Sequence, residues 1–100
     1  MSTHTAIARA MIARADEGKI VQFPARARVV QTDVGQRRIF DSRCGRYRIS
    51  ETRYSCKALK SRWYALKRDD LGWGHVGRFR HHATYAACLA AIALDAKGRV

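Results

Sequence analysis

The sequence predicts an α+β protein in which an antiparallel three-stranded sheet, five-stranded if an additional hairpin joins it, packs against a C-terminal helix. Two observations favour this class. Apolar and polar residues alternate along 46–54 and 62–68, as in strands with one covered face. The chain then ends in an alanine-rich segment whose larger apolar residues recur at helical spacing. Because the chain has 100 residues, we expect these elements to form a single domain.

Residues 1–18 are expected to form an N-terminal helix. Ile7, Met11 and Ile12 fall on one face of it, alanine is frequent, and Gly18 is a natural stop. A helix this short is marginal in isolation, so it must pack on the body of the protein, pair with another chain or fray. We expect it to pack.

Residues 19–45 are expected to form either a hairpin or a basic extended arm. Two stretches of β-branched and apolar residues, within 28–30 and 38–40, flank the sequence Thr-Asp-Val-Gly at 32–35, which has turn chemistry. A hairpin here would raise the number of strands to five. The alternative arm would leave the same arginines open to solvent or to a polyanion.

Residues 46–100 are expected to contain the three-stranded sheet and its helix. The first strand covers 46–54, and the second covers 62–68 after a connecting segment. Turn-forming sequence at 69–74 then leads to a third strand at 75–80. Such a meander needs a helix over one face, because a single sheet cannot exclude water from its apolar side.

The covering helix is expected to run from about Thr84 to Lys97, with Thr84 or His82 near its N-cap and a terminating glycine at position 98. Its apolar residues form one stripe at helical spacing. The stripe consists of Tyr85, Cys88, Leu89, Ile92 and Ala96. The sheet residues expected to face this stripe are Ile49, Leu66 and Phe79. The opposite face of the sheet would then be exposed, and it would carry Arg46, Arg48, Trp63, Lys67, Arg78 and Arg80.

The chain is strongly cationic, and the charge indicates its partner. Twenty Lys and Arg against eight Asp and Glu give a net charge of +12, and residues 26–68 alone hold thirteen basic and three acidic groups. A compact body with this charge repels itself unless an anion lies against it, and arginine suits phosphates and base edges. We therefore expect a nucleic-acid partner, with DNA favoured over RNA. The residues expected to bind it are Arg37, Arg38, Arg46, Arg48, Arg62, Trp63, Lys67, Arg78 and Arg80.

A family resemblance covers residues 46–97. Trp63 opens the second expected strand, Gly77-x-Phe79 lies in the third, and an alanine-rich helix follows. In this order and spacing the segment resembles plant ethylene-response-factor DNA-binding domains and the arm-binding domains of tyrosine recombinases. The resemblance implies a three-stranded sheet in the DNA major groove, braced by the C-terminal helix. It also implies that Arg46, Arg48, Trp63, Arg78 and Arg80 face that groove. The connection at 55–61 is longer than in those families, and the N-terminal helix and basic arm are additional.

The sequence contains no motif typical of a disulfide-rich protein, a zinc ribbon, an enzyme or a membrane protein. Three cysteines without CxxC spacing argue against a disulfide framework and a zinc ribbon. The sequence contains no nucleophile elbow, P-loop or HExxH, and Asp69-Asp70 lies in turn-forming sequence. No apolar stretch has the length of a membrane span. We expect no enzyme activity, no cofactor, no metal and no membrane partner. A cytoplasmic location is expected, although the acid-free first fifteen residues share the composition of a transit peptide.

These observations favour a small basic DNA-binding accessory protein of a phage or mobile element. The alternative is an interaction protein or inhibitor that binds an acidic surface of a host protein or of a nucleoprotein complex. Small size, one domain and a cationic face suit both functions, so the sequence leaves them open.

Overall fold

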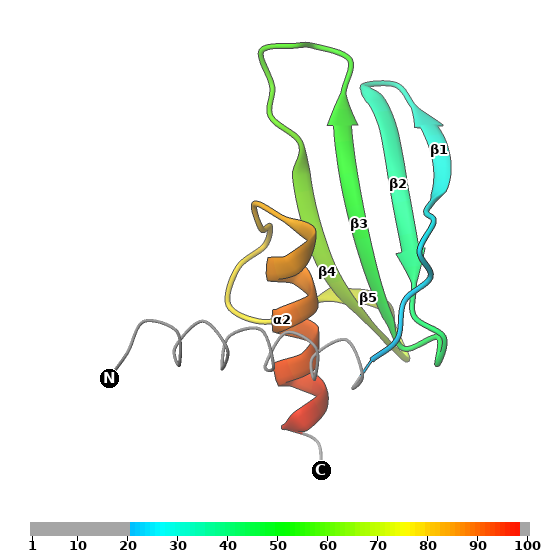
Figure 1. The fold of residues 1–100 in the computed structure, drawn as a ribbon, viewed down its shortest axis with the longest axis vertical. Coiled ribbons are helices and arrows are strands. Elements are labelled where there is room, and N and C mark those ends of the chain that lie inside the picture. The colour runs from blue at the N-terminus through cyan, green and yellow to red at the C-terminus, as the bar shows by residue number, and fades with distance from the viewer. Residues whose placement is uncertain (1–20, 99–100) are drawn as a thin grey trace, which may run out of the picture.

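The computed structural model describes residues 21–98, and the expected N-terminal helix lies outside them. In this range the chain forms a five-stranded antiparallel sheet, with the strands in sequence order, followed by one helix (Figure 1). The elements are β1 (Arg28–Thr32), β2 (Gly35–Asp41), β3 (Tyr47–Tyr54), β4 (Arg62–Asp69), β5 (Gly72–His75) and α2 (Tyr85–Lys97). The expected α+β class is confirmed, and the sheet has the larger of the two strand numbers.

The tight turn between β1 and β2 depends on the glycine at position 35. Thr32 pairs with Gly35, and the Thr32 hydroxyl donates to the Gly35 carbonyl at 3.1 Å. Gly35 has a φ of 151°, and a Cβ on it would lie 2.0 Å from the backbone oxygen of Arg53. Only glycine fits so close to the neighbouring strand. The hairpin interpretation of this segment is therefore confirmed over the extended arm.

The third strand of the expected meander is in a different place. The segment 75–80 was expected to form it, whereas β5 occupies Gly72–His75 and pairs with the end of β4. Asp69 pairs with Gly72, so the turn consists of two residues and the flanking glycines belong to the strand. Gly72 has a φ of 121°, which suits the corner of a tight hairpin. The glycines that indicated a longer turn are thus part of the ladder.

The core lies between α2 and the centre of the sheet. Ile49 on β3 pairs with Ala65 on β4, and both pack with Cys88 and Ile92 of the helix. All four side chains are almost completely buried. The apolar stripe of the helix therefore faces the sheet, as expected. The small side chain of Ala65 lets the helix lie close to the strands.

Two sheet residues do not face the helix as expected. Leu66 follows Ala65, and because neighbouring strand residues point to opposite faces, it lies on the side away from α2. Phe79 lies in the connection between β5 and α2 and is 63% exposed. The same alternation reverses the expected position of Trp63 and Lys67, which lie on the helix side. The pairing of Ala65 with Ile49 explains the positions of Leu66, Trp63 and Lys67, since it turns the odd-numbered residues of β4 toward the helix.

Trp63 belongs to an aromatic cluster beneath the helix. Its ring centroid lies 6.5 Å from that of Phe40 and 5.9 Å from that of Tyr85, which in turn is 5.2 Å from Phe40. Phe40 and Trp63 are stacked, whereas Tyr85 meets both rings edge to face, and aromatic pairs of these kinds stabilise a core beyond their burial. Trp63 therefore connects β2, β4 and α2 and is partly buried.

Both ends of α2 are capped as the sequence predicts. The Thr84 hydroxyl accepts a hydrogen bond from the Ala87 amide at 3.1 Å, which satisfies one of the free amides of the first turn. At the other end the Gly98 amide donates to the Leu94 carbonyl at 3.1 Å. These bonds stabilise the two ends of the helix, whereas its apolar stripe packs it against β3 and β4.

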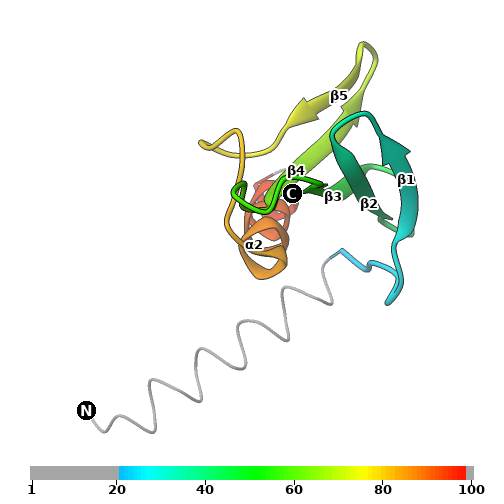
Figure 2. The ribbon, with the colours of Figure 1, turned by 90° about the horizontal axis from the view of Figure 1, so that it is seen from above.

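The sheet bends away from the helix at both edges. Helix α2 packs against β3 and β4, and Figure 2 shows β1 and β5 curving to the opposite side. The sheet is therefore concave on the side turned away from α2, with β3 and β4 at the bottom of the curve, and we use the word trough for this curvature of the strands. We call this concave side the inner face.

Candidate nucleic-acid interface

The inner face carries a concentration of arginine. Strand alternation and the register of the five strands place five arginines on it and one acidic residue among the described strands. The arginines are Arg28, Arg37, Arg48, Arg62 and Arg68, and the acidic residue is Asp41. The excess of four positive charges lies on one side of a sheet whose other side packs on α2.

Small and apolar residues form the floor of the trough. Ser50 and Thr52 lie at its centre on β3, and Ile39 lies beside Ser50 on β2. All three are buried, and they are shorter than the arginine and tyrosine side chains on the same face. The arginines therefore surround a shallow centre instead of projecting from a flat sheet.

Arg48 is held in place at the β5 side of this face. Its guanidinium lies 4.2 Å from the centre of the Trp73 ring, a cation–π contact. Its Nε donates to Asp41 Oδ1 at 2.6 Å, and Arg28 reaches the other carboxylate oxygen at 3.6 Å. The Asp41 carboxylate thus forms ion pairs with two arginines, and the group of three side chains keeps a net positive charge.

Arg37 and Arg62 lie in one row across the sheet. Thr52 is paired with Arg37 on one side and Arg62 on the other, so the two arginines stand two strand spacings apart, about 10 Å. Both are exposed, and within residues 21–98 neither has a carboxylate at ion-pair distance. These two guanidinium groups are available to an anionic ligand.

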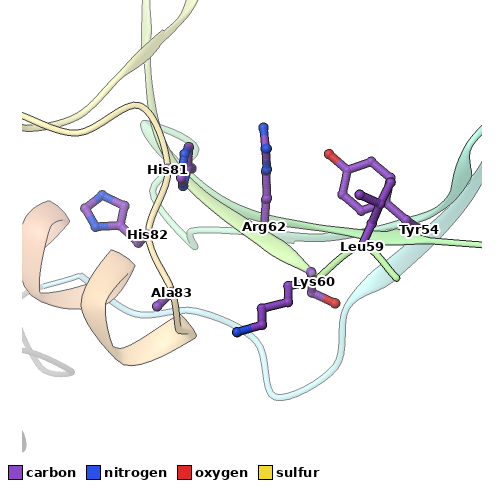
Figure 3. A pocket seen from close by; sticks show the side chains of 8 residues that line it. Tyr54, Leu59, Lys60, Arg62, His81, His82 and Ala83 are labelled. Carbon is purple, nitrogen blue, oxygen red and sulfur yellow. The ribbon is translucent and has the colours of Figure 1, made fainter. Parts of the chain in front are cut away.

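The trough ends in a hollow next to Arg62. It has a volume of about 530 Å³ and lies between the β3–β4 connection and the segment that precedes α2 (Figure 3). Tyr54, Leu59 and Ala83 supply apolar walls, and Arg62, Lys60 and His81 add polar groups. Two backbone hydrogen bonds between Trp63 and His82 hold the segment of His81 against β4. The hollow therefore combines an aromatic ring with two cations.

The predicted binding residues divide into three groups in the structure. Arg37, Arg48 and Arg62 lie on the inner face, as a nucleic-acid site requires. Arg38, Trp63 and Lys67 lie on the helix side. Arg46, Arg78 and Arg80 lie in the connections beside the strands and are exposed. The structure therefore brings together three of the nine.

The charged residues of the helix side serve the fold. Arg38 and Arg53 donate to the same oxygen of the buried Glu51 at 3.0 and 2.9 Å. Lys67 donates to Asp95 at 3.3 Å, and the Tyr47 hydroxyl donates to the other oxygen of this carboxylate at 2.7 Å. Arg38, Arg53 and Lys67 therefore form ion pairs within the protein. We do not count them among the cations that an anionic ligand would neutralise.

The predicted set of binding residues lacks five residues of the inner face. They are Arg28, Tyr54, Tyr64, Arg68 and Trp73. Tyr64 and Arg68 lie at even-numbered positions of β4, as Arg62 does, so all three point to the same face. The alternation therefore predicts their position once the buried face of β4 is known. Trp73 carried no such signal, because its flanking glycines indicated a turn.

The three cysteines are free thiols with different environments. Cys44 and Cys56 are exposed, whereas Cys88 is buried under the sheet. A hydrogen bond with Ser42 lowers the pKa of Cys44, and burial raises the pKa of Cys88 to about 12. Among the described residues, no group of three His, Cys, Asp or Glu side chains is placed to hold a metal ion.

These thiols are expected to react in a fixed order. The thiolate is the reactive form, so a disulfide reagent at mildly alkaline pH should modify Cys44 before Cys56. Cys88 should react only after unfolding in denaturant. Mass spectrometry of peptides at successive times measures the order, with Cys44→Ser as the control for assignment. Equal rates for Cys88 and Cys44 in the native protein would contradict the buried position of Cys88.

Within residues 21–98, no helix has the length and hydrophobicity needed to cross a bilayer. Comparison of the chain with protein-family models, curated proteins and solved structures found no match.

Proposed function

We propose that this protein binds nucleic acid through the inner face of its sheet. The observation that supports the proposal is the combination of five arginines, one carboxylate and three aromatic side chains on the sheet face opposite α2, which no other helix or strand of residues 21–98 covers. The aromatic residues are Tyr54, Tyr64 and Trp73. Phosphates would neutralise the arginines, and the rings would contact bases. The expectation of DNA instead of RNA, and of an origin in a phage or mobile element, stays a prediction.

The charge of the inner face favours a polyanion over isolated anions. Four excess positive charges within one trough repel each other, and the repulsion falls when a chain of phosphates lies along them. Binding of a polymer also releases the counterions condensed on its phosphates, which adds a favourable entropy. We therefore infer that the inner face binds an extended anionic chain.

Replacing Arg37 and Arg62 together by glutamine should weaken binding and reduce its dependence on salt. If each guanidinium contacts one phosphate, the slope of log K against log salt concentration should fall by about two. Fluorescence anisotropy of a labelled oligonucleotide at several salt concentrations between about 50 and 200 mM measures both quantities.

The matched control is the double substitution Arg78→Gln with Arg80→Gln. It removes the same net charge from the connection between β5 and α2, outside the inner face. The control should retain most of the slope of the parent protein. Equal losses in the two double variants would show that binding follows net charge alone, and undetectable binding by the parent at low salt would refute the proposal.

A second candidate function is binding to a protein partner. Phe79 and Leu94 are exposed apolar residues that line a hollow of about 450 Å³ beside α2, with Arg78 and Asp95 at the same site. An exposed apolar hollow with charged groups at its border suits a protein surface. Affinity capture with and without nuclease distinguishes the functions, since a direct protein partner should remain stoichiometric after nuclease treatment.

A further inference from the structure

We infer that the inner face accepts an unpaired nucleic-acid strand in preference to a duplex. This inference rests on the proposed function and specifies its ligand by chemistry: exposed base faces together with phosphates. Such a ligand occurs as single-stranded DNA or as single-stranded RNA. Three features of the inner face support it.

The width of the sheet argues against insertion into a duplex groove. Five strands at a spacing of about 4.8 Å extend over about 19 Å. The major groove of B-DNA is about 12 Å wide and accepts a helix or a two-stranded ribbon. The edges of the sheet also bend toward the ligand side (Figure 2). A trough of this shape encloses a narrow strand instead of entering a groove.

The aromatic rings of the inner face can be used only by bases that are not paired and stacked. Trp73 is 37% exposed, and the guanidinium of Arg48 lies against its ring. Tyr64 lies 6.1 Å from the His75 ring on the neighbouring strand. Indole, phenol and guanidinium groups are the side chains on which unpaired bases stack, whereas a duplex keeps its base faces covered.

These rings are also held in position before any ligand binds. Trp73 lies within β5, and Arg48 is fixed by its 2.6 Å hydrogen bond to Asp41. Tyr64 lies within β4 and is partly buried. A ligand therefore orders few side chains when it stacks on them, which reduces the entropic cost of binding.

The hollow at the end of the trough has room for a base turned out of the strand. Its volume of about 530 Å³ lies next to Arg62, and the side chains of Tyr54 and Leu59 line it (Figure 3). A base could contact the Tyr54 ring while its phosphate contacts Arg62 and Lys60. A paired base would have to leave its duplex first, at a cost in stacking and pairing.

The test compares three labelled probes with the full 100-residue chain at equal salt. The probes are oligo(dT), oligo(rU) and a mixed-sequence DNA duplex, each of about 16 nucleotides per strand, a length within the range of small single-strand-binding domains. We expect at least one single strand to bind about tenfold or more tightly than the duplex. The relative affinity of oligo(dT) and oligo(rU) identifies the preferred sugar.

Substitution of the rings tests whether stacking causes the preference. Trp73→Ala and Tyr64→Ala should each weaken single-strand binding about tenfold and leave duplex binding nearly unchanged. Trp73→Phe should restore most of the lost affinity, because it keeps a ring. The matched controls are Leu71→Ala and Val34→Ala, which remove exposed apolar side chains at the two hairpin turns and should change nothing. Circular dichroism verifies that each variant is folded.

Failure of this inference is distinguishable from failure of the proposed function. Equal or tighter binding of the duplex, or full single-strand affinity in the two alanine variants, overturns the preference for unpaired strands. Salt-dependent binding that depends on Arg37 and Arg62 would still support the proposed function in that case. Absence of binding to all three probes at low salt overturns both.

Discussion

Replacing Ile92 by alanine is expected to lower the free energy of unfolding by about 2–5 kcal/mol. Ile92 is 0% exposed and lies at the centre of the helix stripe, in the same cluster as Ile49 and Ala65. The substitution removes buried apolar surface and leaves a cavity that β3 and β4 cannot fill, because the sheet hydrogen bonds hold these strands in place. The loss should be a large fraction of the stability of a small domain, which is about 5–15 kcal/mol.

Urea unfolding followed by circular dichroism measures this loss. The control is Leu94→Ala, two residues further along the same helix, where the side chain is 73% exposed. That substitution changes the same type of element and should alter the free energy of unfolding by no more than about 0.5 kcal/mol. Similar losses in the two variants would contradict the placement of the core between α2 and the sheet.

The second large effect is expected when Arg38 and Arg53 are both replaced by leucine. The two arginines donate to one oxygen of Glu51, whose side chain is 6% exposed. Without them the carboxylate stays in the protein with no cation beside it. Removing the partners of a buried charge lowers the free energy of unfolding by about 3–5 kcal/mol, because the desolvated carboxylate is then no longer compensated by a cation.

A third substitution separates the ion pairs from general packing damage. Adding Glu51→Leu removes the isolated charge, and replacement of a whole buried ionic group by apolar residues is often neutral. The triple variant should therefore regain most of the stability lost by the double variant, measured by the same urea titration. A triple variant no more stable than the double variant would exclude the isolated carboxylate as the cause.

The two stability predictions and the binding predictions concern opposite faces of one sheet. Arg38 and Glu51 lie on the side of α2, whereas Arg37 and Arg62 lie on the inner face. Adjacent residues of the same sequence thus have separate roles, one in the fold and one in the proposed binding. Variants of the helix side that remain folded should keep the salt dependence of binding, which allows the two sets of experiments to be interpreted independently.

Several elements could be predicted from local sequence alone. The helix from Thr84 onward was identified with its caps, because its stripe, its N-cap hydroxyl and its final glycine all act within a few residues. The strand at 46–54 and the connection at 55–61 were also predicted, since strict alternation and turn-forming residues are local signals. The same holds for the hairpin around Gly35, whose conformation depends on that glycine.

The candidate site was predicted less completely, and β4 shows why. Its two alternating sets both contain cations and apolar residues: Trp63, Ala65 and Lys67 on one side, and Arg62, Tyr64, Leu66 and Arg68 on the other. Periodicity separates the sets but does not say which one faces the helix. Larger side chains suggested Leu66 for the core, whereas pairing with Ile49 places the small Ala65 there.

The net charge, the helix with its caps and the alternation of the strands follow from the sequence, because each depends on composition or on residues close together in the chain. The pairing of Ile49 with Ala65, the position of β5 and the bend of the sheet depend on contacts between distant segments. Those contacts bring Arg37, Arg48, Arg62 and Trp73 to one surface, while Arg38, Trp63 and Lys67 become part of the fold. A shift of one residue in register would exchange these sets, since alternate strand residues point to opposite faces.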